Sequence, residues 1–99
     1  MRDFCMKLKK DVINIEYIRQ LIRAIGSIGA NYIEASDDLG KTDERMKIKI
    51  SRRESKESIY WLKLVLIYDD TSLGNERIDL VNEGTQIQKI LSSIFVKIS

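Results

Sequence analysis

Apolar residues recur at intervals of three and four along most of the chain, which is the spacing of one face of an α-helix. The pattern persists for too long to be a β-strand, although the many isoleucines favour strands weakly. Three long segments and one short segment carry it, so the sequence predicts four helices. The apolar stripe of the second segment consists of Ile15, Ile18, Ile22, Ile25, Gly29, Tyr32 and Ser36, with Leu21, Ile28 and Ala35 beside it.

Short polar stretches divide these segments. Residues 37–40 (Asp-Asp-Leu-Gly) form one break, residues 69–75 form another, and a weaker one lies near residues 10–14. The first segment, residues 2–10, has room for only about two to three turns. We therefore expect an all-α fold, an antiparallel up-and-down four-helix bundle with a short first helix, which forms a single domain over residues 1–99.

The expected helix starts are residue types that favour the N-cap position. Asn14 is expected to cap the second helix, and Thr42, which two acidic residues follow, is expected to cap the third. The fourth helix is expected to start at Gly74 or Asn75. At the first break, Gly40 is able to adopt a left-handed conformation.

The third segment is predicted to have a broad inner face that is bulky at its ends and small in the middle. Two carboxylates lie on this face, and burying an ionised carboxylate is costly unless it is paired. One stripe of the inner face consists of Lys47, Ile50, Glu54, Glu57, Trp61, Leu64 and Tyr68, and the neighbouring stripe consists of Ile48, Ser51, Ser55, Ser58, Leu62 and Val65.

The opposite face of the third segment is basic, with no acidic residue among its cations. Residues 41–63 hold eight basic and four acidic side chains, whereas the whole chain has a net charge of only +2. Such a face either contacts phosphates or is an ordinary solvated surface. Its cations are Arg45, Lys49, Arg52, Lys56 and Lys63, with Arg53 and Tyr60 beside them.

The inward carboxylates predict a structural polar network. Glu54 and Glu57 are expected to bond to Arg23, Asn31 or Lys47, and Glu34, near the end of the second helix, is expected to face them. A carboxylate metal site and a subunit interface are the alternatives. The metal alternative is weak because ferritin-like bundles use a Glu-x-x-His motif and this chain has no histidine.

Small residues in the second helix predict a close helix–helix contact. Gly26, Gly29 and Ala30 lie inside a periodic helical segment rather than between a strand and a helix, so they do not form a phosphate-binding loop. Glycine inside a helix costs about 1 kcal/mol relative to alanine, and close packing on another helix would offset that cost. The serines of the third segment are the expected partners.

Composition argues against catalysis. Because the chain has no histidine, the single Cys5 lacks the usual base that would activate it, and no serine has a base partner by pattern. The chain is therefore expected to be no enzyme and to hold no cofactor and no metal. The longest apolar run, Leu64–Ile67, is too short to span a membrane, and we expect a cytoplasmic protein.

Two separated segments resemble a known family. Residues 23–35 (RAIGSIGANYIEA) are similar to a motif "R-S-x-x-S-I-G-A-N-x-x-E-A", and residues 53–62 (RESKESIYWL) to "K-E-A-x-E-S-x-Y-W-L". Both motifs belong to the four-helix bundle proteins encoded within intervening sequences of bacterial 23S ribosomal RNA genes. The similarity extends from about residue 15 to residue 66 and more loosely to the end.

The resemblance implies a ring-like homopentamer. It also implies a distant relationship to the accessory variability proteins of diversity-generating retroelements, which are basic pentamers that bind nucleic acid and a reverse transcriptase. The chain departs from the family in its short first helix, and in Arg52 and Glu44, which stand where the family usually has apolar residues.

Pattern and resemblance together predict an oligomeric helical accessory protein that binds RNA or DNA non-specifically through the basic face. The alternative is a structural or protein-binding oligomeric scaffold that binds no nucleic acid. Oligomerisation is also expected because a core of this size does not cover every apolar side chain. The core is not expected to cover all of the following apolar side chains, so some of them are expected to meet another chain: Leu21, Ile33, Ile59, Leu66, Ile67, Val81 and Phe95.

Overall fold

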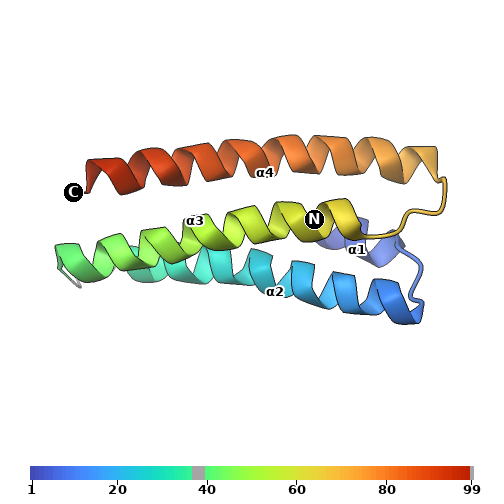
Figure 1. Cartoon of the computed structure of the whole chain (residues 1–99), viewed down its shortest axis with the longest axis horizontal. Helices are drawn as coiled ribbons and strands as arrows, with labels where there is room; N and C mark the ends of the chain where they lie inside the picture. Colours follow the sequence, from blue (N-terminus) through green and yellow to red (C-terminus); the bar gives the residue numbers. More distant parts are fainter. Residues whose placement is uncertain (37–39, 99) are drawn as a thin grey trace.

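The computed structural model of the chain describes residues 1–36 and 40–98, and every regular element in these ranges is an α-helix (Figure 1). The prediction of an all-α four-helix bundle with a short first helix is confirmed. Asp37, Asp38 and Leu39 of the first predicted break lie outside the described residues. The helices are α1 (Arg2–Lys7), α2 (Val12–Ala35), α3 (Lys41–Leu64) and α4 (Thr71–Lys97).

The helices begin earlier than the predicted caps. Asp11 caps α2, and its side chain accepts a hydrogen bond from the backbone nitrogen of Asn14 at 2.8 Å. Asp70 caps α4 in the same way through the nitrogen of Leu73 at 3.0 Å. The prediction that Asn14 is a cap is wrong, because an aspartate three residues before it takes that position.

The other two predicted starts are also wrong. Gly40 is the N-cap of α3, with a φ of +88°, so Thr42 lies inside the first turn. Gly74 and Asn75 lie inside α4. A positive φ is a conformation that glycine adopts without a steric penalty, which explains why the chain enters α3 at this residue.

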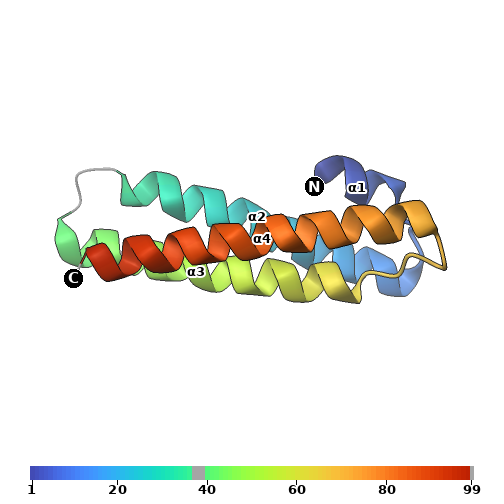
Figure 2. The same ribbon diagram turned by 90° about the horizontal axis from the view of Figure 1, so that it is seen from above.

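The central element of the bundle is α3, which packs against α2 on one side and α4 on the other. Successive helices run in opposite directions (Figure 1). The short α1 contacts α4 and lies beside its N-terminal half, and among the described residues no fourth helix lies beside its C-terminal half (Figure 2). In the described residues, the bundle therefore has four helices side by side at one end and three at the other.

The apolar core is concentrated at the end that includes α1. Phe4, Cys5 and Leu8 from the first segment pack there against residues of all three long helices. Leu21 is fully buried in this cluster, so it is not one of the apolar side chains left for contact with another chain. The members contributed by the long helices and the turn after α3 are Ile18, Leu21, Leu62, Val65 and Leu73.

Small side chains bring α2 and α3 together, but they are not the predicted glycines. Ala24 of α2 and Ser55 of α3 are buried, and the hydroxyl of Ser51 donates to the carbonyl of Ile28 at 2.9 Å. A Cβ at Gly26 or Gly29 would meet nothing within 4 Å. The prediction that these glycines allow close packing within the chain is wrong, because the rotation of α2 directs them away from α3.

A close approach does occur at another glycine. A Cβ added to Gly84 of α4 would lie 3.1 Å from the side chain of Ile59 on α3. A side chain at this position would fit only if Ile59 shifted by a few tenths of an ångström.

The buried amide of Asn14 links the two interhelical connections at one end of the bundle. Its Nδ2 donates to the carbonyls of Lys9 at 2.9 Å and Leu66 at 3.0 Å, and its Oδ1 accepts from the nitrogen of Leu66 at 2.8 Å. Lys9 precedes α2 and Leu66 follows α3, so one side chain replaces the backbone partners that both connections lack.

The turn after α3 has two residues with positive φ, Tyr68 at 51° and Asp69 at 64°. The hydroxyl of Tyr68 donates to the carboxylate of Asp11, and the ammonium of Lys9 lies 5.0 Å from the centre of the tyrosine ring. The hydrogen bond lowers the pKa of Asp11 and raises the pKa of Tyr68. These contacts join the α3–α4 turn to the start of α2.

Replacing Asn14 by leucine is expected to destabilise the fold by about 2–4 kcal/mol, because the nitrogen and carbonyl of Leu66 and the carbonyl of Lys9 lose their buried partner. Denaturant unfolding followed by circular dichroism measures the change. Asn31→Leu, the same substitution later in α2, is the control. Within the part of the chain that the structure describes, Asn31 bonds only to Ser27 of its own helix, so that variant is expected to change stability by less than about 1 kcal/mol. Equal losses in the two variants would contradict the role of Asn14.

Candidate nucleic-acid interface

The basic face, defined as Arg45, Lys49, Arg52, Arg53, Lys56 and Lys63, extends along the outer side of α3. Arg52 is half-buried and the other five are exposed. The cations keep to this side because the opposite side of α3 contributes Ser51, Ser55 and Leu62 to the interior. The helical spacing therefore places all six on one surface, as predicted.

Two arginines of the basic face contact α4 rather than projecting freely. The guanidinium of Arg45 lies 4.3 Å from the centre of the Phe95 ring, and that of Arg52 lies 4.6 Å from it. Cation–π contacts of this kind hold the planar group over the ring. The sequence analysis missed the role of Phe95, which it named only among apolar side chains that the core does not cover in full, because nothing in the sequence indicates which residue of α4 faces α3.

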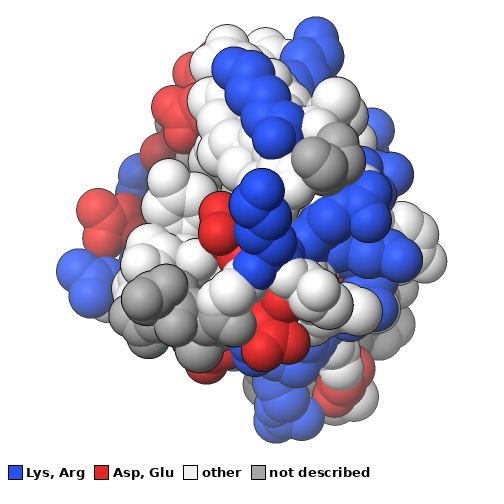
Figure 3. Space-filling model, turned by 90° about the vertical axis from the view of Figure 1, so that its left-hand side faces the viewer, with Lys and Arg blue, Asp and Glu red and all other residues white. Residues whose placement is uncertain are grey.

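No cation of the basic face takes part in an ion pair within residues 1–36 and 40–98. The acidic residues of α3 are positioned elsewhere. Asp43 and Glu44 lie in its first turn, where the helix dipole favours acids, and Glu54 and Glu57 pair with α2. Seen end-on, lysine and arginine side chains gather on the right-hand side of the molecule (Figure 3).

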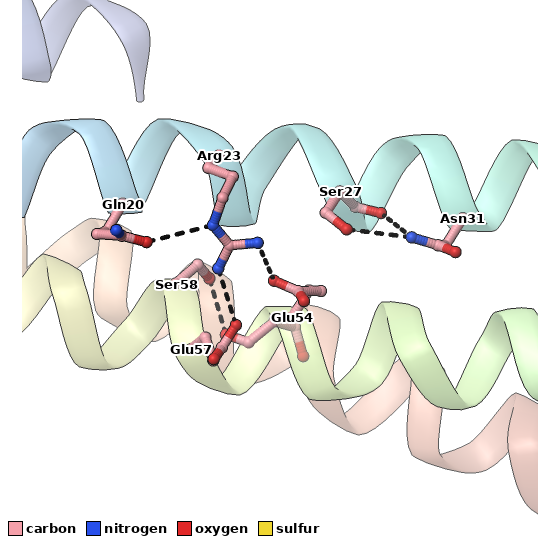
Figure 4. Close-up of polar contacts among 8 residues, drawn as sticks. Gln20, Arg23, Ser27, Asn31, Glu54, Glu57 and Ser58 are labelled. Carbon is pink, nitrogen blue, oxygen red and sulfur yellow. Dashed lines mark hydrogen bonds and ion pairs between the residues drawn. The ribbon is translucent and has the colours of Figure 1, made fainter.

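The predicted polar network is present around Arg23 (Figure 4). From α2, its guanidinium reaches Glu54 at 3.4 Å and Glu57 at 3.1 Å. The side chain of Glu54 is only 8% exposed, whereas that of Glu57 is 45% exposed. One arginine therefore compensates a buried carboxylate and a half-exposed one at the same time.

The two carboxyls differ in acidity. Burial, followed by the hydrogen bond and the negative charge of Glu57, raises the pKa of Glu54. The hydrogen bond with Glu54, followed by the bond to Arg23, lowers the pKa of Glu57. Glu57 is therefore the stronger acid of the pair.

The other predicted network residues lie apart from this cluster. Asn31 bonds to the carbonyl and hydroxyl of Ser27 within α2. Glu34 pairs with Lys47 across α2 and α3. The prediction that Glu34 faces Glu54 and Glu57 is wrong, because it lies several turns further along α2 than Arg23. The structure thus forms two separate ionic links between these helices.

The metal alternative finds no ligand set in the described residues, where no three acidic, histidine or cysteine side chains lie close enough to hold an ion. The Arg23 guanidinium bonds to both inward carboxylates instead. Cys5 is buried, and burial raises its pKa, which disfavours the nucleophilic thiolate.

Comparisons with protein-family models, with curated proteins and with solved structures found no match to this chain. The family resemblance of the two sequence motifs therefore stays a prediction. None of the helices in the described ranges is both long enough and apolar enough to cross a membrane.

Glu54→Gln and Glu57→Gln are expected to shift stability in opposite directions at neutral pH. The raised pKa of Glu54 means that the parent loses stability as the pH rises from the ordinary carboxyl value of 4.5 through the folded pKa. Glu54→Gln removes this loss, so the stability of the variant is expected to increase relative to that of the parent as the pH rises through this range to neutrality.

The contribution of Glu57 to stability has the opposite pH dependence. Its lowered pKa contributes stability that is present above 4.5 and lost as the pH falls through the folded pKa. Glu57→Gln is expected to cost up to about 1 kcal/mol at neutral pH, and the cost shrinks in acid. Denaturant titrations at several pH values measure both effects, and the same pH dependence in both variants would refute the assignment.

Proposed function

We propose that this chain is a non-catalytic accessory protein that binds nucleic acid through the basic face of α3 without reading its sequence. The observation that carries the proposal is a row of six cations on one helix, none of which is neutralised by an ion pair in the described residues. Phosphates are the partners that such a row suits, because each neutralised phosphate releases a counterion.

The contacts of Phe95 support phosphate binding. Arg45 and Arg52 lie seven residues apart along α3, which is two helical turns, and both stack on this one ring. Side chains that are already ordered lose less conformational freedom when they bind. The exposed lysines between and beyond them, Lys49 and Lys56, supply charge along the same line.

Repetition of the face strengthens the binding. Five or six surface cations on one chain give only non-specific affinity, with a Kd on the order of 10⁻⁴ to 10⁻⁶ M at physiological salt. A homo-oligomer, the pentamer that the resemblance implies, would bind far more tightly through avidity if one nucleic acid reached several copies. RNA and DNA are both suitable partners, since no base-reading group stands out, and the cytoplasm is the compartment we propose.

A scaffold function without nucleic acid is the second candidate. It is supported by the large apolar side chains that remain exposed on α2 and α4, among them Ile22, Ile33 and Ile90. A protein partner such as the reverse transcriptase implied by the resemblance would belong to this function as well.

Lys49→Gln, Lys56→Gln and Lys63→Gln combined in one variant are expected to weaken binding to every RNA and DNA sequence alike. The magnitude of the salt dependence, the slope of log K against log salt concentration, is expected to fall by about 3 for duplex DNA. Fluorescence anisotropy with labelled RNA and DNA across salt concentrations measures both. The variant spares Arg45 and Arg52, so the packing of α3 on Phe95 is kept.

The matched control removes three positive charges from other helices: Arg2→Gln, Arg19→Gln and Lys89→Gln. These residues are exposed on α1, α2 and α4. The control is expected to retain more of the parent's affinity and salt slope than the α3 variant. Absence of binding by the parent at low salt, or equal losses in both variants, would favour the scaffold function.

A further inference from the structure

Residues of α2 and α4 line an apolar groove. It lies in the half of the bundle that α1 does not reach, since α1 lies beside the other half of α4 (Figure 2). Met1 lines a hollow of about 150 Å³ where α1 begins, together with residues of α2, α3 and α4. A second hollow of about 250 Å³ continues from there with almost wholly apolar walls. Its walls are Ile28, Gly29, Tyr32, Ile87, Ile90 and Leu91.

The rims of the groove remain exposed. On α2, Ile22 is 53% exposed, Tyr32 49% and Ile33 65%, and on α4, Ile87 is 44% and Ile90 58% exposed. The stripe that the sequence predicts for α2 is thus only partly used by the core, since Ile18 is buried while Ile22 and Tyr32 are not. We call the exposed set, Ile22, Gly26, Gly29, Tyr32, Ile33, Ile87 and Ile90, the α2–α4 apolar face.

The total exposed area of the chain exceeds that of an average monomer of its mass. A monomeric protein of 11.5 kDa is expected to expose about 5,800 Å², whereas this chain exposes 6549 Å². The excess, roughly 700 Å², is close to the ~800 Å² that each partner buries in a standard protein interface. The radius of gyration, 14.9 Å, also exceeds the ~13 Å of a compact chain of this length.

The scarcity of charge along the groove suits a second copy better than a strongly charged partner. Among the described residues, Glu83 has the one charged side chain that lines the first hollow, and none that lines the second hollow carries a charge. Two copies therefore do not repel one another there, and the face has no cation to attract a phosphate. The basic face lies on the far side of α3, so nucleic acid and a second copy do not compete for one surface.

We propose that the α2–α4 apolar face is the surface on which a second copy of this chain docks. This inference rests on the oligomer included in the proposed function and assigns one of the two surfaces of each copy that meet in a ring. Gly26 and Gly29 fit the assignment, since a Cβ at either position would meet nothing within the chain. A neighbouring helix is then able to approach α2 closely along these residues.

Ile90→Glu tests the proposal, with Ile78→Glu as the matched control. Both isoleucines lie on α4 with similar exposure, 58% and 60%, but Ile78 lies outside the apolar face, near Lys63 and Arg77. Sedimentation velocity and light scattering of the full chain at micromolar concentrations measure the assembly. Ile90→Glu is expected to raise the dissociation constant by about tenfold or more, and Ile78→Glu to leave it near that of the parent.

Gly29→Ala is a second variant that does not depend on introducing a charge. It is expected to raise the thermal stability of the monomer fold, because alanine favours helix and the space is open, and at the same time to weaken assembly. A parent that remains monomeric at micromolar concentration would overturn the proposal. So would an oligomer that Ile90→Glu and Gly29→Ala leave intact.

Nucleic-acid binding separates this proposal from the proposed function. A monomeric Ile90→Glu chain is expected to retain weak binding at low salt through the basic face, with the avidity lost. If the parent assembles through the apolar face but binds no nucleic acid, the docking surface stands and the nucleic-acid function fails.

Discussion

The end of the bundle where α1 packs on the three long helices depends on the burial of the Asn14 side-chain amide. Asn14 is 0% exposed, and it bonds to Lys9 before α2 and to Leu66 after α3. Buried backbone groups require partners, and connections between helices cannot supply them from a regular ladder. Because one side chain provides three such bonds, the ends of α1, α2 and α3 are held together, and Phe4 and Leu8 can complete the apolar cluster there.

The same need to compensate buried polar groups separates the charges of α3. Glu54 is buried by the packing of α2 on α3, and Arg23 is the cation that reaches both it and Glu57. With these acids paired toward α2, the outer side of the helix retains its cations. Phe95 then orders two of them through α4. The basic face is thus a consequence of how α3 is packed as well as of its composition.

Because α1 is short, it covers only the half of the bundle that includes the N-terminal half of α4. Beyond the N-terminal end of α1, no fourth helix of the described residues lies beside α4 (Figure 2), and α2 and α4 share an apolar groove. Exposed apolar surface of this kind is typical of interaction sites, which is why we propose that a second copy docks there. The groove and the basic face lie on opposite sides of α3. Assembly through one and phosphate contact through the other are therefore geometrically compatible, which joins the two proposals into one description of the molecule.

The sequence by itself determined the helical class, the four segments, the basic face and the inward position of Glu54 and Glu57, because helical spacing depends only on local geometry. The tertiary structure selected Arg23 as their partner among the three candidates that the sequence left open. Only the tertiary structure decided the rotation of α2, which buries Ala24 and Leu21 and leaves Gly26 and Gly29 outside. It also decided that Asn14 bridges two connections instead of capping a helix. Periodicity defines the apolar face of a helix but not the element that packs on it. Apolar residues make up more than half of α2, so several rotations of this helix would bury an apolar surface. The contact of Phe95 with the two arginines depends on the register between α3 and α4, which no single helix determines.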